Sequence, residues 1–441
     1  MAIVVALAWS SLARAQVAGC FVSRAVGGVS IDADGVVRNA EQDALGELGR
    51  KWAESLQQIP GDLNQPSELR KVSLKQLEAA IAQHVNQGTP LPDAIRYLAG
   101  LQRIRYVFVY PDAGDIVLAG YGEGWLVDER GNVVGANTRR PVLWLDDLLV
   151  ALRTAESAAQ GGITCSIDPT QAGLERLQSY ARSLAAGVNP QTAAAQIEEQ
   201  LGPQLVTVTG VPADSHFARV LVAADFRMKR LAMNFDPSPV SGLPSFLHML
   251  EGKTSRGMHN MLPRWWLATH YDALLTDGEG LAWELRGPGV KAMTEDDFLA
   301  ADGSRKQSGK ASPVAQKWAD NMTARYEELS LKEPIFGELR NCMDLAVIAA
   351  LLVKENLPAR ANCSLGILLN GSDLQATRFH SPAQVDTKAS FIETKNSYII
   401  SASGGVLIDS WGAAGHRESS EALAPLHAEA AQNRGDAWWW N

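Results

Sequence analysis

The chain has 441 residues, of which 46% are hydrophobic and 20% are charged, and its formal net charge is −9 at pH 7. These proportions are typical of globular proteins and exclude a fibrous or disordered chain. Because no basic block offsets the acidic charge, we set nucleic acid aside as a partner.

The first fifteen residues predict a signal peptide that is removed after Ala15. Residues 1–13 are mostly apolar, and Ala13-Arg14-Ala15 has the small-x-small pattern that signal peptidase accepts. The run is shorter than the roughly 20 residues of a membrane-spanning helix, and we expect no transmembrane span elsewhere. The expected location is therefore periplasmic or secreted. No Lys or Arg precedes the run, so a buried N-terminal helix is the alternative.

A lipid anchor at Cys20 is a second alternative. Val17-Ala18-Gly19-Cys20 resembles a bacterial lipobox, but Arg14 and Gln16 interrupt the apolar stretch that normally runs into such a box. Secretion without lipidation is favoured.

Turn chemistry and apolar spacing predict the elements of the first half. Asp and Gly lie between β-forming residues in 31–37 and in 127–133, which is typical of antiparallel hairpins. The other expected elements, in chain order, are helices at 74–82 and 91–101, strands at 103–110 and 115–119, a meander to 140, a helix at 145–155, a strand at 162–167, a helix at 171–185 and a short helix that ends near 202.

The second half predicts a similar mixture. We expect a strand at 205–209, a helix at 214–233, antiparallel strands around 263–266 and 282–286, an exposed loop at 302–312, a buried helix at 345–353 and a final hairpin of 397–400 with 406–408. Arg227, Lys229 and Arg230 lie at the end of the second of these elements. Cations suit a helix C-terminus and usually mark a solvated face, so holding an anion is a secondary interpretation.

The order of these elements predicts an α+β protein with mixed helices and mainly antiparallel sheets. The chain is long for one core, and the break near 202 suggests two domains, 16–202 and 203–441, after a signal peptide at 1–15.

Cys342 is the sharpest catalytic candidate. We expect it at the start of the central apolar helix, where the helix dipole lowers a thiol pKa. The run from Cys342 to Arg360 also resembles the nucleophile helix of transglutaminase-like cysteine enzymes, which implies a His and an Asp on the following strands. A buried thiol and a disulfide with Cys363 are the alternatives.

The two partners that this resemblance implies are incompletely matched. Asp409 occupies a suitable strand end, but the strand before it carries no His, and the nearest preceding one is His380, in an expected loop. Without a general base a thiol hydrolase is incomplete. We therefore predict that Cys342 is not a nucleophile, and that His380 and Asp409 are weak candidates only.

Other chemistry is weaker still. The cysteines and histidines show no metal-ligand spacing and no nucleotide-binding motif occurs, so we expect no metal and no cofactor. Acidic turns and tryptophans could serve a carbohydrate site, although core and surface roles explain them as well. The carboxylates concerned are Asp277, Glu279, Glu284, Glu295, Asp296 and Asp297.

Several segments together carry a family resemblance. They are residues 27–32, 97–100, 116–120, 162–169, 224–230 and 403–406. Through them the chain resembles an uncharacterised family of exported bacterial proteins, the domain-of-unknown-function family 1598. The resemblance implies export and lends no catalytic residue to any position.

Three functions follow from these observations, and the balance is against an enzyme. The first is a non-catalytic binding or structural protein of the cell envelope, with an unidentified envelope partner or ligand. The second is a thiol-dependent hydrolase or acyl transferase of transglutaminase-like type that uses Cys342. The third is a carbohydrate-binding or carbohydrate-cleaving protein.

Overall fold

A computed structural model describes residues 25–40, 50–51, 54, 56, 58–183, 189–250, 261–299, 305–390, 402–432 and 440. The predicted signal peptide, Cys20 and the strand expected at 397–400 lie outside these ranges.

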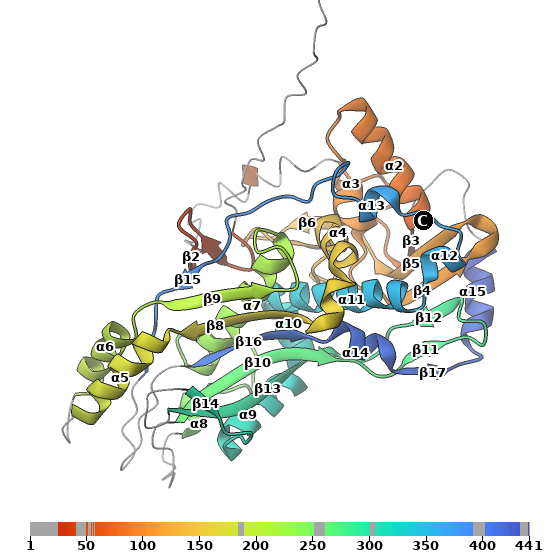
Figure 1. Cartoon of the computed structure of the whole chain (residues 1–441). Helices are drawn as coiled ribbons and strands as arrows, with labels where there is room; N and C mark the ends of the chain where they lie inside the picture. The colour runs from red at the N-terminus through yellow and green to blue at the C-terminus, as the bar shows by residue number, and fades with distance from the viewer. Residues whose placement is uncertain are drawn as a thin grey trace, which may run out of the picture.

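Two large sheets organise the described part of the chain (Figure 1). The larger sheet runs, in spatial order, β1 (Val29–Ile31), β2 (Val36–Asn39), β15 (Gln384–Val385), β9 (Gln204–Thr209), β8 (Ile163–Pro169), β16 (Ser403–Ile408), β10 (Met261–His270), β13 (Gly289–Leu299) and β14 (Arg305–Gln307). The second runs β17 (Arg417–Ser419), β11 (Leu274–Thr276), β12 (Ala282–Glu284), β4 (Tyr106–Tyr110), β5 (Asp115–Gly122) and β3 (Ser67–Ser73). A separate ribbon pairs β6 (Trp125–Val127) with β7 (Val133–Gly135).

Most strand pairs are antiparallel, and the parallel ones among the described strands are β2 with β15, β10 with β16 and β11 with β17. The prediction of an α+β fold with mainly antiparallel sheets is confirmed.

Both expected hairpins form, and their turns use the same chemistry. Asp32 accepts backbone N–H bonds from Asp34 and Val36 at 3.0 and 2.9 Å, and Asp128 accepts them from Arg130 and Asn132 at 2.9 and 2.7 Å. An aspartate that binds the backbone two residues on stabilises a tight turn.

The two large sheets are joined by segments that pass from one to the other. β10 continues into β11, β12 continues into β13, and β16 leads through the short helix α14 (Ser410–Gly415) to β17. Strands from both sides of residue 202 therefore share each sheet. The domain boundary expected there stays a prediction.

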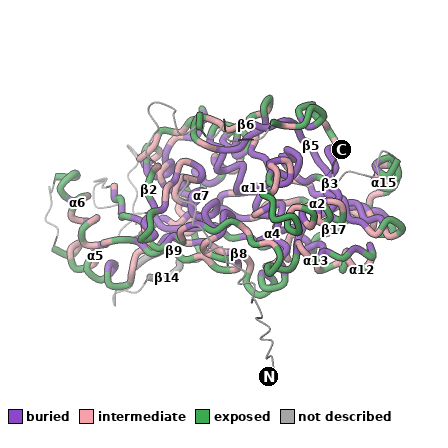
Figure 2. Tube along the Cα trace, turned by 90° about the horizontal axis from the view of Figure 1, so that it is seen from above, coloured by how far each residue is buried: buried purple, intermediate pink, exposed green. Residues whose placement is uncertain are grey.

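The core is centred on α11 (Pro334–Lys354), of which residues 334–352 are all buried. It packs against α4 (Leu145–Thr154), α7 (His216–Ala232), α10 (Tyr326–Lys332) and α14. Figure 2 shows this central position as a continuous buried trace through the middle of the molecule. The expected buried helix is thus confirmed, but it begins eleven residues earlier than the apolar run at 345–353. Pro334 at its first turn is the start signal.

The described ranges contain further α-helices. They are α2 (Leu74–Gln87), α3 (Asp93–Arg96), α5 (Gln171–Ser183), α6 (Pro190–Leu201), α8 (Phe246–Leu250), α9 (Pro313–Ala324), α12 (Leu357–Arg360), α13 (Gly366–Leu369) and α15 (Leu423–Gln432). α5 and α6 pack together through Leu174, Leu177 and Ile197 at one end of the larger sheet (Figure 1).

Three expectations need correction. The helix expected at 91–101 stops at Arg96, because Leu98, Ala99 and Gly100 have positive φ and cannot continue it. Only glycine fits at position 100, since a Cβ there would collide with the Glu123 carbonyl. Part of the expected loop at 302–312 is an edge strand, β14, paired with β13. Instead of closing a local hairpin, β16 pairs with β8 and β10, which are distant in sequence.

Candidate functional site

A small, partly open cleft lies beside the C-terminal half of α7, where the helix packs on β8. Its free volume is about 40 Å³, which is room for roughly three water molecules. Its apolar lining includes Phe226, Met233 and Phe235, with Val385 of β15. Wider hollows of about 480 to 550 Å³ elsewhere on the described surface are more open.

Lys229 contributes the first cation of the cleft and is itself buried. Its ammonium donates to Asp225 Oδ2, one helical turn earlier, and to the Ile167 carbonyl of β8, both at 2.9 Å. Asp225 is completely buried, and burial raises its carboxyl pKa to about 6, with a smaller rise from Asp168 and an opposing effect of Lys229. The interpretation of this face as solvated is therefore wrong at Lys229.

Arg230 contributes the second cation and is held on one side by Asp236. Its Nε and Nη2 donate to the two carboxylate oxygens at 2.7 and 2.9 Å. The guanidinium lies 5.6 Å from the Phe226 ring centroid and 5.8 Å from that of Phe235. The hydrogen bonds from Arg230 lower the pKa of Asp236, and the charges of Arg227 and Arg230 lower it further. The arrangement fixes a planar cation against two aromatic rings.

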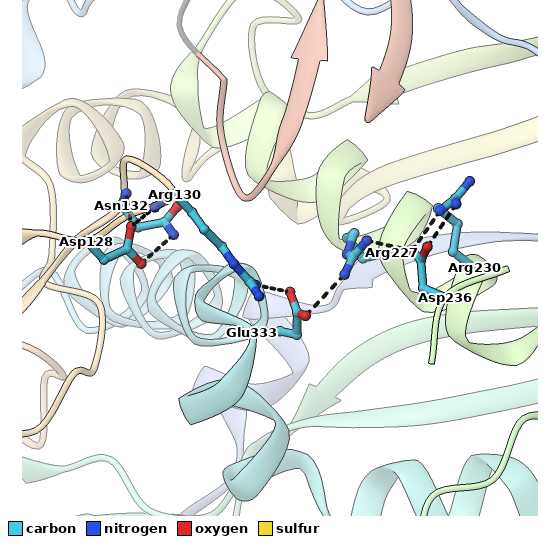
Figure 3. A network of polar contacts seen from close by, with 7 residues as sticks. All are labelled: Asp128, Arg130, Asn132, Arg227, Arg230, Asp236 and Glu333. Carbon is cyan, nitrogen blue, oxygen red and sulfur yellow. Dashed lines mark hydrogen bonds and ion pairs between the residues drawn. The ribbon is translucent and has the colours of Figure 1, made fainter. Parts of the chain in front are cut away.

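A chain of ion pairs connects this cation to a distant turn (Figure 3). Asp236 also accepts from Nη1 of Arg227 at 2.6 Å, and Nη2 of the same guanidinium donates to Glu333 at 3.1 Å. Glu333, at the start of α11, accepts from Arg130 of the β6–β7 turn at 2.9 Å. Since Glu333 is buried and bound on both sides, the network ties three segments together.

Cys342 does not lie at a helix start. It is in the third turn of α11 and is completely buried. Burial raises its thiol pKa well above the ordinary value, and the carboxylates of Asp147, Glu338 and Asp344 raise it further. The dipole effect expected from the apolar run therefore does not reach the thiol, because the helix begins at Pro334.

The other two members of the suggested triad have different surroundings. Asp409 is exposed and caps α14, accepting the Gly412 N–H at 2.8 Å. His380 follows Phe379, whose N–H donates to the Asp214 carbonyl at 2.7 Å. The prediction that Cys342 is not a nucleophile stays a prediction.

Cys342 and Cys363 do not form the disulfide considered as an alternative, since Cys165, Cys342 and Cys363 are all free and buried thiols. Burial also raises the pKa of Cys165 well above its usual range and that of Cys363 to about 11.

A buried His–Asp pair lies near Cys342 and was not identified from the sequence. His216 Nδ1 is 2.9 Å from Asp147 Oδ2, and the His216 ring stacks on Trp144 with 4.2 Å between centroids. Asp147 lies in the first turn of α4, where the helix dipole favours a negative charge. Its pairing with the first residue of α7 joins α4 to α7, and no sequence spacing reveals a contact 69 residues apart.

The residues suggested for a carbohydrate site are mostly in structural contacts. Trp265 and Trp283 are buried in the core, as aromatic residues recurring in strands usually are. Asp277 accepts the Leu281 N–H at 2.8 Å within its turn, and Glu284 pairs with Arg105 at 2.9 Å.

The described residues show neither a cluster of metal ligands nor a membrane-spanning helix. No three His, Cys, Asp or Glu side chains among them converge as metal ligands would. No helix within the same ranges has the length and apolarity to span a membrane.

A family model matches one segment of the chain. Residues 165–246 match the family described as "Protein of unknown function (DUF1598)". The resemblance seen in the sequence is thereby confirmed over this range. No curated protein and no solved structure matches the chain.

Proposed function

We propose that this chain is a non-catalytic ligand-binding protein of the cell envelope, and that its ligand occupies the cleft beside α7. One observation carries the proposal: seven of the eleven residues that line the cleft belong to the segment 165–246 that matches the family. An apolar wall with a few convergent polar groups is typical of a ligand site.

The state of Cys342 supports a non-catalytic role. A nucleophilic thiol needs access to substrate and a lowered pKa. Cys342 is buried, and its pKa is raised by burial and by three carboxylates.

Ligand-observed NMR with a library of small organic fragments tests the binding role. Ala402 lines the cleft, so Ala402→Leu should fill it, whereas Ala172→Leu adds the same bulk at an exposed position of α5. We expect wild type and Ala172→Leu to share a set of binding fragments that Ala402→Leu loses while keeping its unfolding midpoint. Fragments that bind all three proteins equally would overturn the proposed site.

N-terminal sequencing of material exported by the producing cell tests the envelope location. We expect the mature chain to begin at Gln16, because Ala13-Arg14-Ala15 precedes it. An intact Met1 outside the cytoplasm would contradict this, and a lipidated Cys20 would establish an anchored form instead.

A further inference from the structure

We infer that the cleft beside α7 selects a monocarboxylate carried on an apolar stem, such as a fatty acid. This inference rests on the proposed function and names the ligand class of the same site. Its grounds are the donors that remain unused in the cleft, the charge balance around it and the apolar wall beside the cations.

The first ground is the set of N–H donors that the described residues leave unused. An ammonium has three donors, and Lys229 uses two of them, on Asp225 and on the Ile167 carbonyl. Arg230 uses Nε and one N–H of Nη2 on Asp236, and no described residue accepts from its Nη1. That nitrogen points away from Asp236 in Figure 3. Both cations line the cleft, so a carboxylate there could accept from each.

Charge balance sets the limit on the ligand's charge. Lys229 and Arg230 are each already paired, with Asp225 and Asp236. The cleft also has Asp386 on its lining, which pairs loosely with Arg38 at 3.7 Å. A dianion such as phosphate would add two negative charges to a site that already has three carboxylates on or next to its lining. A single delocalised negative charge fits the donors with less repulsion.

The rim adds little to this balance. Lys388 also lines the cleft, but its ammonium is exposed and 3.4 Å from Glu198. Exposed pairs of this kind contribute little because solvent and salt screen them. We therefore expect discrimination to come from the two inner cations.

Size and surface chemistry indicate the apolar stem. A volume of about 40 Å³ accommodates a carboxylate head, and because the cleft is partly open, a stem attached to the head can leave through its open side. Phe226 and Phe235 lie beside the Arg230 guanidinium, and Met233 completes the same wall. A hydrocarbon stem leaving the head group would lie against these side chains and gain burial.

Calorimetric titration with octanoate, octanol and inorganic phosphate tests the assignment. We expect octanoate to bind the wild-type protein at least tenfold more tightly than octanol, and phosphate not to compete. The double variant Lys229→Gln with Asp225→Asn removes the inner cation without leaving a buried unpaired charge. It should lose at least tenfold in octanoate affinity, and Lys317→Gln, an exposed lysine of α9, should lose none.

The outcomes separate the two proposals. Equal affinities for octanol and octanoate, or effective competition by phosphate, would overturn the carboxylate assignment while leaving ligand binding in the cleft. Tight octanoate binding that survives in the double variant would also overturn it. If octanoate fails to bind and Ala402→Leu retains every fragment bound by the wild type, the cleft itself is excluded. Thermal unfolding of each variant establishes that it is folded.

Discussion

Two carboxylates beside the cleft are perturbed in opposite directions, although both bind cations of α7. Burial raises the pKa of Asp225 to about 6, and the charges of Lys229 and Arg264 offset only part of this rise. Asp236 is less buried and accepts from both Arg227 and Arg230, so its pKa is lowered. Position in the structure, rather than residue type, decides the sign.

Asp225 should make the folded state weaker as the pH rises from about 4 to 6. A carboxyl whose pKa is raised in the folded protein binds its proton more tightly there than in the unfolded chain, so ionisation favours unfolding. The shift from 3.8 to about 6 corresponds to about 3 kcal/mol. Urea unfolding between pH 4 and pH 8 should show that Asp225→Asn removes this decline. An unchanged decline in the variant would contradict the assignment.

Asp236→Asn is the matched control for that experiment. Its lowered pKa means that the ionised form stabilises the fold above the ordinary aspartate pKa, and that this contribution is lost as the pH falls. Asp236→Asn should therefore lower the free energy of unfolding most at neutral pH and least in acid. This pH trend is opposite to the one expected for Asp225→Asn.

Cys342 should resist alkylation in the folded protein. Iodoacetamide reacts with the thiolate, and burial raises the Cys342 pKa and closes off the sulfur. We expect mass spectrometry to find Cys342 unlabelled at pH 7 until denaturant is added. Rapid native labelling of Cys342 would reopen the thiol-enzyme hypothesis, whereas labelling of Cys363 alone would not.

Single residues were the hardest level to predict from sequence. The sequence predicts an ion pair between Asp225 and Lys229, which are four residues apart on a helix. It does not predict that β8 buries this pair. Burial of Lys229 depends on the Ile167 carbonyl, 62 residues earlier in the chain. The expectation of a solvated face failed because packing overrode a local charge pattern.

At the level of elements, α11 should carry a large share of the stability. Leu351→Ala removes a fully buried side chain and should cost about 2–5 kcal/mol in unfolding free energy. Leu331→Ala in α10 makes the same change where 37% of the residue is exposed, and should cost much less. Urea unfolding of the two variants measures the difference. Equal costs would mean that α11 is not the central packing element.

Glu333 should hold α7 and the β6–β7 turn to the start of α11. Glu333→Gln keeps the shape of the side chain but removes the charge that Arg130 and Arg227 share, and should cost about 1–3 kcal/mol. Glu355→Gln, which loses an exposed pair with Arg417, should cost below about 1 kcal/mol. Chemical unfolding measures both costs. If Glu333→Gln lowers the unfolding free energy no more than Glu355→Gln does, the ion-pair network does not stabilise the fold.

Element types were more predictable than their limits. Apolar spacing predicted the central helix, but its first turns could not be predicted because they contain polar residues. These residues are buried because each has a partner: Arg340 with Glu327, Asn341 with the Pro141 carbonyl and Asp344 with Arg103. These partners belong to other elements, so a local sequence pattern cannot predict them.

At the scale of the whole molecule, long-range strand pairing decides the architecture. Local turn chemistry predicted the hairpins at 31–37 and 127–133, both of which form. The parallel pairing of β10 with β16 joins segments more than a hundred residues apart and had no local signal. The pairing of β9 with both β8 and β15, and the packing of α7 on β8, bring together the segments that line the cleft.

The most direct test of the cleft as a ligand site follows methionine methyl groups by NMR during an octanoate titration. Met233 lines the cleft, while Met322 and Met343 are buried in α9 and α11 and provide internal references. Met233→Leu assigns the reporter signal. We predict that the Met233 methyl shifts saturably while the two references stay fixed. A Met233 signal that does not move when octanoate is bound, or three signals that move together, would contradict the account.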